Sequence, residues 1–164
     1  MIIKKLAFED LLKVCSLLHK AKKDHLAVQH NSLENNLTIE KQFLRDVFPL
    51  SNQKNYRYVG IQDRNKLIGF ASFQIYKNNY IRESLTSGNV AELTNNYIDP
   101  RYRGQNLQRL LIQRRLDMIE KPCSVYAVIH KENSASIKNV SKEGFAHFES
   151  FSQLKSDSYV KYLF

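Results

Sequence analysis

Hydrophobic residues follow two different spacings along this chain, and these spacings predict where strands and helices lie. Apolar positions that alternate with polar ones indicate strands, whereas apolar positions three or four residues apart indicate helices. Residues 2–6 are strand-like, and a helical spacing begins at Phe8. Thr38 is a suitable N-cap for a second helix, which we expect to end at Pro49.

The middle of the chain predicts a hairpin and then a central strand. Residues 56–62 and 66–76 have the character of strands, and Asp63-Arg64-Asn65 between them is typical of a turn. Residues 90–98 form the predicted central strand. Asp99-Pro100 stops this strand, because proline has no N–H to donate to a sheet.

Helices and strands alternate in the second half of the chain. Residues 107–120 predict an amphipathic helix. Its apolar positions are Leu107, Leu110, Leu111, Met118 and Ile119. Pro122 ends this helix, and Gly144 closes the next one in the C-cap region. The remaining predicted elements are a strand at 125–129, a helix at 134–143, and strands at 146–154 and 158–164 joined by a turn at 155–158.

The order of elements is therefore β-α-α-β-β-β-α-β-α-β-β, which predicts an α/β or α+β fold around one mixed sheet. A chain of 164 residues suits a single domain spanning 1–164. An apolar fraction of 43% and a charged fraction of 25% indicate a globular protein.

The charge balance favours a polyanionic ligand or partner, because 25 Lys and Arg residues exceed 16 Asp and Glu residues. The pattern of the basic residues argues against a nucleic-acid partner, since they are spread along the chain without interleaved aromatic residues or a known motif. No apolar run approaches the roughly 20 residues of a membrane span, so we expect no membrane partner. Cys15 and Cys123 lack metal-ligand spacing, which predicts reduced thiols in a cytoplasmic protein without a metal.

The most informative stretch is NNYIDPRYRGQNLQRLLIQ, where a basic loop connects the central strand to the amphipathic helix. A loop that opens a helix can bind phosphate, because the first N–H groups of the helix are free and its dipole favours an anion. Arg101, Arg103 and Arg109 add positive charge there. The alternative is an ordinary turn with solvent-exposed arginines, but the position between strand and helix favours a phosphate site.

The order of elements and the run AELTNNYIDPRYRGQNLQRLLI resemble the acetyl-CoA-dependent N-acetyltransferases of the GCN5-related (GNAT) superfamily. The family's loop, R/Q-x-x-G-x-G/A, corresponds here to Arg103, Gly104, Gln105, Asn106, Leu107 and Gln108. Downstream, NSASIKNVSKEGF resembles the second cofactor motif, in which an Asn begins a helix that ends in Gly-Phe. The resemblance implies acetyl-CoA as cosubstrate and a GNAT-like fold of about six or seven strands and about four helices.

Two residues of the loop depart from the family pattern. Asn106 stands where the family has glycine, and asparagine is the residue after glycine that best tolerates a left-handed backbone. Gln108 replaces a small residue in the first helical turn. Its side chain could donate to a phosphate oxygen, point away or obstruct the cofactor, so its direction is the question that the sequence leaves open.

The resemblance also implies residues for catalysis. Glu92 matches the glutamate that acts as general base in the histone acetyltransferases of the superfamily. The alternative is a surface glutamate paired with a basic neighbour. Backbone N–H groups of Asn96, Tyr97 and Ile98 are expected to stabilise the oxyanion, and the strand is expected to pair with the pantetheine arm.

The downstream helix is expected to contribute Asn133 and Ser136 to cofactor binding. The family's general acid is usually a tyrosine in this helix. The sequence has no tyrosine between Asn133 and Gly144, so we assign no general acid.

Three functions remain open, of which an RNA- or DNA-binding domain is the least favoured. The first is transfer of an acetyl group to a primary amine of a small molecule, a lysine or a protein N-terminus, by a monomer or homodimer. The second is a non-catalytic module on the same fold that binds CoA, another nucleotide or a macromolecular partner.

Overall fold

The computed structural model describes residues 1–7, 10, 13–14, 16–17, 20, 56–76, 89–152 and 155–164. The predicted helix that Thr38 opens lies outside these residues, as does most of the helix predicted from Phe8. Val14 and Leu17, which belong to this first helix, are helical and buried.

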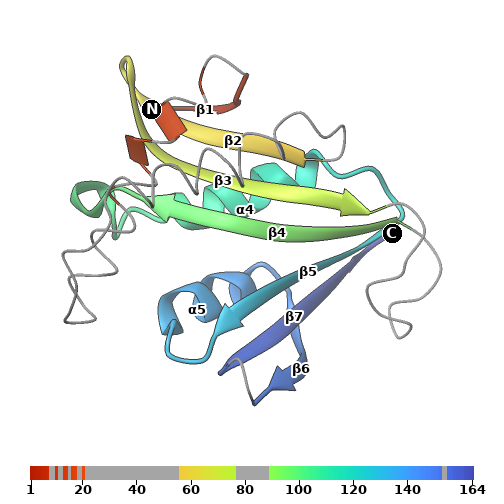
Figure 1. Ribbon diagram of the computed structural model, residues 1–164. Helices are drawn as coiled ribbons and strands as arrows, with labels where there is room; N and C mark the ends of the chain where they lie inside the picture. Colours follow the sequence, from red (N-terminus) through yellow and green to blue (C-terminus); the bar gives the residue numbers. More distant parts are fainter. Residues whose placement is uncertain are drawn as a thin grey trace, which may run out of the picture.

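Seven strands form one sheet in the order β1-β2-β3-β4-β5-β7-β6 (Figure 1). The strands are β1 Ile2–Lys5, β2 Tyr56–Asp63, β3 Lys66–Tyr76, β4 Asn89–Ile98, β5 Cys123–His130, β6 Ala146–Phe151 and β7 Ser156–Leu163. Strands β4 and β5 are parallel, and every other neighbouring pair is antiparallel. This mixed sheet confirms the predicted fold class and the predicted sequence of strands.

Two α-helices are described in the second half of the chain. Helix α4, Leu107–Asp117, leads from β4 to β5, and α5, Ser134–Lys142, leads from β5 to β6. A short 3₁₀ helix, η2 Pro100–Tyr102, precedes α4. Helix α4 packs on β2, β3 and β4 and also contacts α5. None of the described helices is long and apolar enough to cross a membrane.

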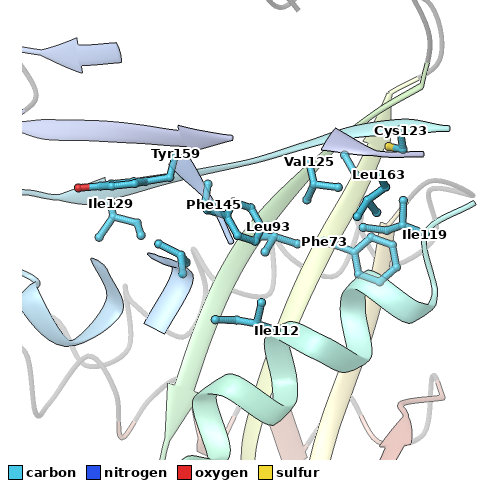
Figure 2. Packing of buried hydrophobic residues seen from close by; sticks show 13 residues of the cluster. Phe73, Leu93, Ile112, Ile119, Cys123, Val125, Ile129, Phe145, Tyr159 and Leu163 are labelled. Carbon is cyan, nitrogen blue, oxygen red and sulfur yellow. The ribbon is translucent and has the colours of Figure 1, made fainter. Parts of the chain in front are cut away.

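The main core lies between α4, α5 and the sheet. Figure 2 shows Phe73 of β3 and Leu93 of β4 near Ile112 of α4, with Val125 of β5 close by. Because neighbouring residues of a strand point to opposite faces, Leu93 on the α4 side turns Glu92 to the other face of the sheet. The side chains of Glu92 and Thr94 thus lie on the face opposite α4.

The ladder between β3 and β4 contains a β-bulge. Ala71 pairs with Asn96 but Ser72 pairs with Thr94, so Asn95 is an extra residue on β4. A bulge bends the strand that carries it and increases its local twist. It therefore changes the course of β4 between Glu92 and the end of the strand.

Arg115 of α4 is buried against this bulge, with 2% of its surface exposed. Its Nη1 donates to the backbone oxygens of Ser72 (3.0 Å) and Thr94 (3.2 Å), one on each strand. Its Nε donates to Leu111 O at 3.1 Å. Burial lowers the pKa of Arg115 to about 9, so the side chain stays charged at neutral pH. A buried cation thus ties α4 to both strands where their register shifts.

Helix α4 differs from its prediction in its end and in its buried face. It ends at Asp117 rather than Glu120, because the N–H of Met118 bonds to Arg115 O, three residues back, and tightens the last turn. Leu110, predicted on the apolar face, is 40% exposed. Ile112 and Arg115 are buried instead.

The C-terminal strands also differ from their predicted bounds. Strand β5 is longer than predicted, because its whole length from Cys123 to His130 pairs with β7. The predicted turn at 155–158 was wrong, since β7 already begins at Ser156. Lys155 has a φ of 46°, so the left-handed residue of the turn lies before Ser156. Gly144 follows α5 with a φ of 82°, which confirms its predicted place after the helix.

Candidate active site

Strands β4 and β5 pair over only part of their length. Asn89 to Glu92 pair with Cys123 to Tyr126, and the pair Glu92–Tyr126 is the last. Beyond it the two strands diverge toward their C-terminal ends (Figure 1). In the part of the chain that the structure describes, no strand pairs with the β5-facing edge of β4 after this point. The result is a V-shaped split with Glu92 at its apex.

The ladder fixes which backbone groups of β4 face this split. Asp99 N donates to Ile68 O at 2.8 Å, which makes Ile98–Gly69 a non-hydrogen-bonded pair. The N–H of Ile98 therefore points away from β3, and by alternation so does that of Asn96, whereas Tyr97 bonds to β3. Of the three predicted backbone donors, Asn96 and Ile98 face the split and Tyr97 does not.

The loop after β4 has the backbone conformation of an anion cradle. Gly104 has a φ of 81°, Asn106 has a φ of 58°, and the φ of Gln105 between them is not positive. Alternating conformations of this kind direct successive N–H groups to one side, a "nest" for anions. Among the described residues, no hydrogen bond uses the N–H of Gln105, Asn106, Leu107 or Gln108. The Leu107 side chain is buried and anchors the loop to the core.

The three arginines around the loop each have a partner within the protein. Arg101 donates to Asp99 at 2.7 and 3.0 Å, and these bonds lower the pKa of Asp99 to about 2. Arg109 is 2.7 Å from Glu143. Arg103 donates to Ile98 O at 3.1 Å and lies over the Tyr97 ring. An anion at the loop would therefore be attracted by the backbone N–H groups and the helix dipole as much as by the charge of the arginines.

Gln108 turns toward α5 rather than into the loop. Its Nε2 donates to Ser136 Oγ at 2.9 Å, and its Oε1 accepts from Asn139 Nδ2 at 2.8 Å. Both ends of the amide are thus occupied by α5. Gln108 joins the first turn of α4 to Ser136 and Asn139 of α5, and this answers the question that the sequence left open.

The start of α5 lies beside the start of α4. Asn133 is the N-cap of α5, and its side-chain oxygen accepts from Ser136 N at 3.1 Å. Through Gln108, Ser136 connects this cap to α4. The structure therefore brings Asn133 and Ser136 next to the loop, although their described side-chain bonds are to the protein itself.

Glu92 is half-buried on the face of the sheet opposite α4. Its Oε2 accepts from Tyr76 Oη at 2.9 Å and from Tyr126 Oη at 3.0 Å. Among the described residues, neither oxygen is paired with a lysine or arginine. Within the described residues, Glu92 is therefore not a surface glutamate paired with a basic neighbour, which was the alternative that the sequence left open.

A second polar cluster lies beside the bulge on the same face. Tyr56 Oη is 2.8 Å from Thr94 Oγ1 and 3.3 Å from Asn95 Nδ2, and Ser72 Oγ is 2.8 Å from Thr94 Oγ1. These hydroxyl and amide groups satisfy one another's hydrogen bonds. They hold the side chains of Thr94 and Asn95, which precede Asn96 on β4, in place.

The positive φ of Asn106 gives a direct test of the cradle. Asn106→Val should weaken acetyl-CoA binding by about tenfold or more, because a β-branched residue cannot hold this conformation and the N–H groups would turn away. Asn106→Gly should keep the wild-type Kd within about twofold. Titration calorimetry measures both. Equal Kd values for Asn106→Val and wild type would contradict the cradle.

Comparison with known proteins agrees with this geometry. The model of the acetyltransferase (GNAT) family matches residues 18–145. The chain therefore belongs to the GNAT family of acetyltransferases, which confirms the predicted family and enzyme class. No curated protein sequence matches the chain.

Several solved structures share the fold. PaiA N-acetyltransferase from Thermoplasma acidophilum, in complex with coenzyme A, has a TM-score of 0.72 at 18% identity, covering 99% of this chain and 98% of its own. Ribosomal-protein-alanine N-acetyltransferase from Brucella melitensis has a TM-score of 0.67 at 18% identity, covering 99% and 100%. Aminoglycoside 6'-N-acetyltransferase AAC(6')-IG from Acinetobacter haemolyticus has a TM-score of 0.65 at 15% identity, covering 92% and 94%. At these identities the likeness establishes the fold.

Sequence reasoning missed three side chains of this region: Tyr76, Tyr126 and Arg115. For Arg115 a signal was present, because it follows the buried Leu107 and Leu111 at intervals of four residues. The tyrosines gave no local signal, since their contact with Glu92 joins residues on three different strands.

Proposed function

We propose that this enzyme transfers the acetyl group of acetyl-CoA to a primary amine, with Glu92 as general base. The observation that carries the proposal is the continuous arrangement along the chain from Glu92, through the open edge of β4, to the loop at 104–108. The arrangement offers a proton acceptor, a strand edge and an anion cradle in that order. An acyl thioester attached through an extended arm to a pyrophosphate requires these three parts in the same order.

In the proposed binding mode, the N–H groups of 104–108 hold the pyrophosphate. The pantetheine arm lies along the β5-facing edge of β4 like an added strand and pairs with Ile98. The family's usual contacts at Asn133 and Ser136 would border the same site from α5. Gln108 would act indirectly, because its amide positions α5 relative to the loop.

The chemical step requires a neutral amine. Its nitrogen attacks the thioester carbon, an N–H proton passes to Glu92 directly or through a water, and the C–S bond breaks to release CoA thiolate. The N–H of Asn96 is the proposed oxyanion donor, since it faces the split and is nearer than Ile98 to Glu92. The partners of Asn96 and Glu92 on β3, Ala71 and Gln74, are three residues apart, so the two β4 positions are about 10 Å apart along the strand, which leaves room for the amine and a bridging water.

The class of acceptor amine is best found by direct assay. Incubation with acetyl-CoA and a panel of small amines, aminoglycosides, lysine peptides and alanine-started peptides should release free CoA thiol with at least one acceptor. The panel follows the different acceptors named for proteins of the same fold. Binding of acetyl-CoA without release of thiol across the panel would contradict the enzyme and favour the non-catalytic module.

A further inference from the structure

Two phenols converge on a single oxygen of Glu92. Tyr76 comes from β3 and Tyr126 from β5, so the strands on both sides of β4 each supply one donor. The Oη to Oε2 distances are 2.9 and 3.0 Å. The other carboxylate oxygen, Oε1, has no hydrogen bond within the described part of the chain. The two oxygens of this carboxylate therefore have different surroundings.

The proton of Tyr76 is available for Glu92. Tyr76 Oη also lies 3.0 Å from Gln74 Oε1, a second oxygen that can accept its proton. A phenol has one proton, and a charged carboxylate oxygen is a stronger acceptor than an amide oxygen, so Glu92 is the favoured acceptor. Burial and the nearby carboxylate raise the pKa of Tyr76, which keeps the phenol protonated as a donor.

The register of the sheet explains why the two donors reach Glu92. Tyr126 is paired with Glu92 in the last residue pair before β4 and β5 separate. Tyr76 lies two residues from Gln74, the partner of Glu92 on β3, and reaches it diagonally. The carboxylate is thus held on both sides at the apex of the split.

We propose that Tyr76 and Tyr126 are positioning residues that hold Oε2 of Glu92, and that Oε1 is the oxygen that accepts the amine proton. The inference rests on the proposed function. In the step, the lone pair of the amine nitrogen forms the new C–N bond, and the C–S bond breaks with its electron pair leaving on the CoA thiolate. One N–H bond breaks as well, its electron pair stays on nitrogen, and its proton moves to Oε1 and then to solvent. Without the phenols, the carboxylate can rotate and spends less time aligned with the amine.

Phe substitutions test this, because they remove only the hydroxyl. Tyr76→Phe and Tyr126→Phe should each lower kcat by about tenfold, the effect of losing one charge-assisted hydrogen bond. The KM for acetyl-CoA should stay within about twofold. Tyr162→Phe removes an exposed phenol of β7 and should match wild type. Initial rates are measured with the acceptor that the amine panel identifies.

A cycle with Glu92→Gln separates positioning from a structural role. In the Glu92→Gln background, either Phe substitution should change kcat by less than about twofold, because there is no base left to align. A tenfold loss in that background, or full activity of both Phe variants, would overturn the inference. If Glu92→Gln itself leaves kcat unchanged, the proposed role of Glu92 fails and the inference fails with it. If Glu92→Gln lowers kcat but both Phe variants keep the wild-type kcat, the inference about the tyrosines is overturned while the proposed role of Glu92 stands.

Discussion

Glu92→Gln is expected to lower kcat for acetyl transfer by about 100-fold, the usual contribution of a general base. Glutamine has the size of glutamate and can still accept from Tyr76 and Tyr126 through its oxygen, but it cannot take a proton at neutral pH. The Kd for acetyl-CoA should stay within about twofold, because the cofactor is expected to bind along the strand edge and the loop. Steady-state rates and calorimetry measure the two quantities separately.

The matched control for this substitution is Glu132→Gln. The side chain of Glu132 is 86% exposed in the turn after β5, so the same loss of charge should leave kcat unchanged. An active Glu92→Gln enzyme would show that the base is another group or that the free amine in solution suffices. A variant that loses acetyl-CoA binding together with turnover would show that Glu92 supports the fold of the site.

Arg115→Met is expected to lower the free energy of unfolding by about 2–4 kcal/mol, because the buried oxygens of Ser72 and Thr94 lose a charged donor. Methionine fills much of the same volume, so the effect reports the hydrogen bonds more than a cavity. The bulge at Asn95 should also become less defined, and acetyl-CoA binding should weaken with it. Urea unfolding at constant m-value measures the change in stability.

Arg114→Met serves as the control, since Arg114 is the exposed neighbour on the same helix. It should unfold within about 0.5 kcal/mol of wild type. A buried arginine is expensive to desolvate, and replacing buried ionic groups by apolar ones sometimes stabilises a protein. An Arg115→Met variant as stable as wild type would therefore contradict the view that Arg115 supports the bulge.

The strands were largely predictable because their signals are local. Alternating apolar residues located β2, β3 and β4, and Asp99-Pro100 marked the end of the central strand. The errors arose where non-local contacts decide an element's end. Strand β5 extends to His130 because β7 pairs with its whole length. Leu110 is exposed because α4 turns Ile112 toward the core.

The site was predictable in outline and not in its detailed geometry. The strand, loop and helix around Gly104 follow from residue types, and Asn106 has the left-handed backbone that its identity suggested. The bulge at Asn95 could not be predicted, because an extra residue on one strand depends on pairing with the next. The direction of Gln108 depends on α5, which lies far away in sequence.

Calorimetric titration of the wild-type protein with acetyl-CoA tests the central claim most directly. We expect one site per chain with a Kd in the micromolar range, in keeping with ordinary substrate affinities, and competition by free CoA at the same site. Absence of binding at millimolar acetyl-CoA would contradict the cradle at 104–108 and the transfer reaction that depends on it.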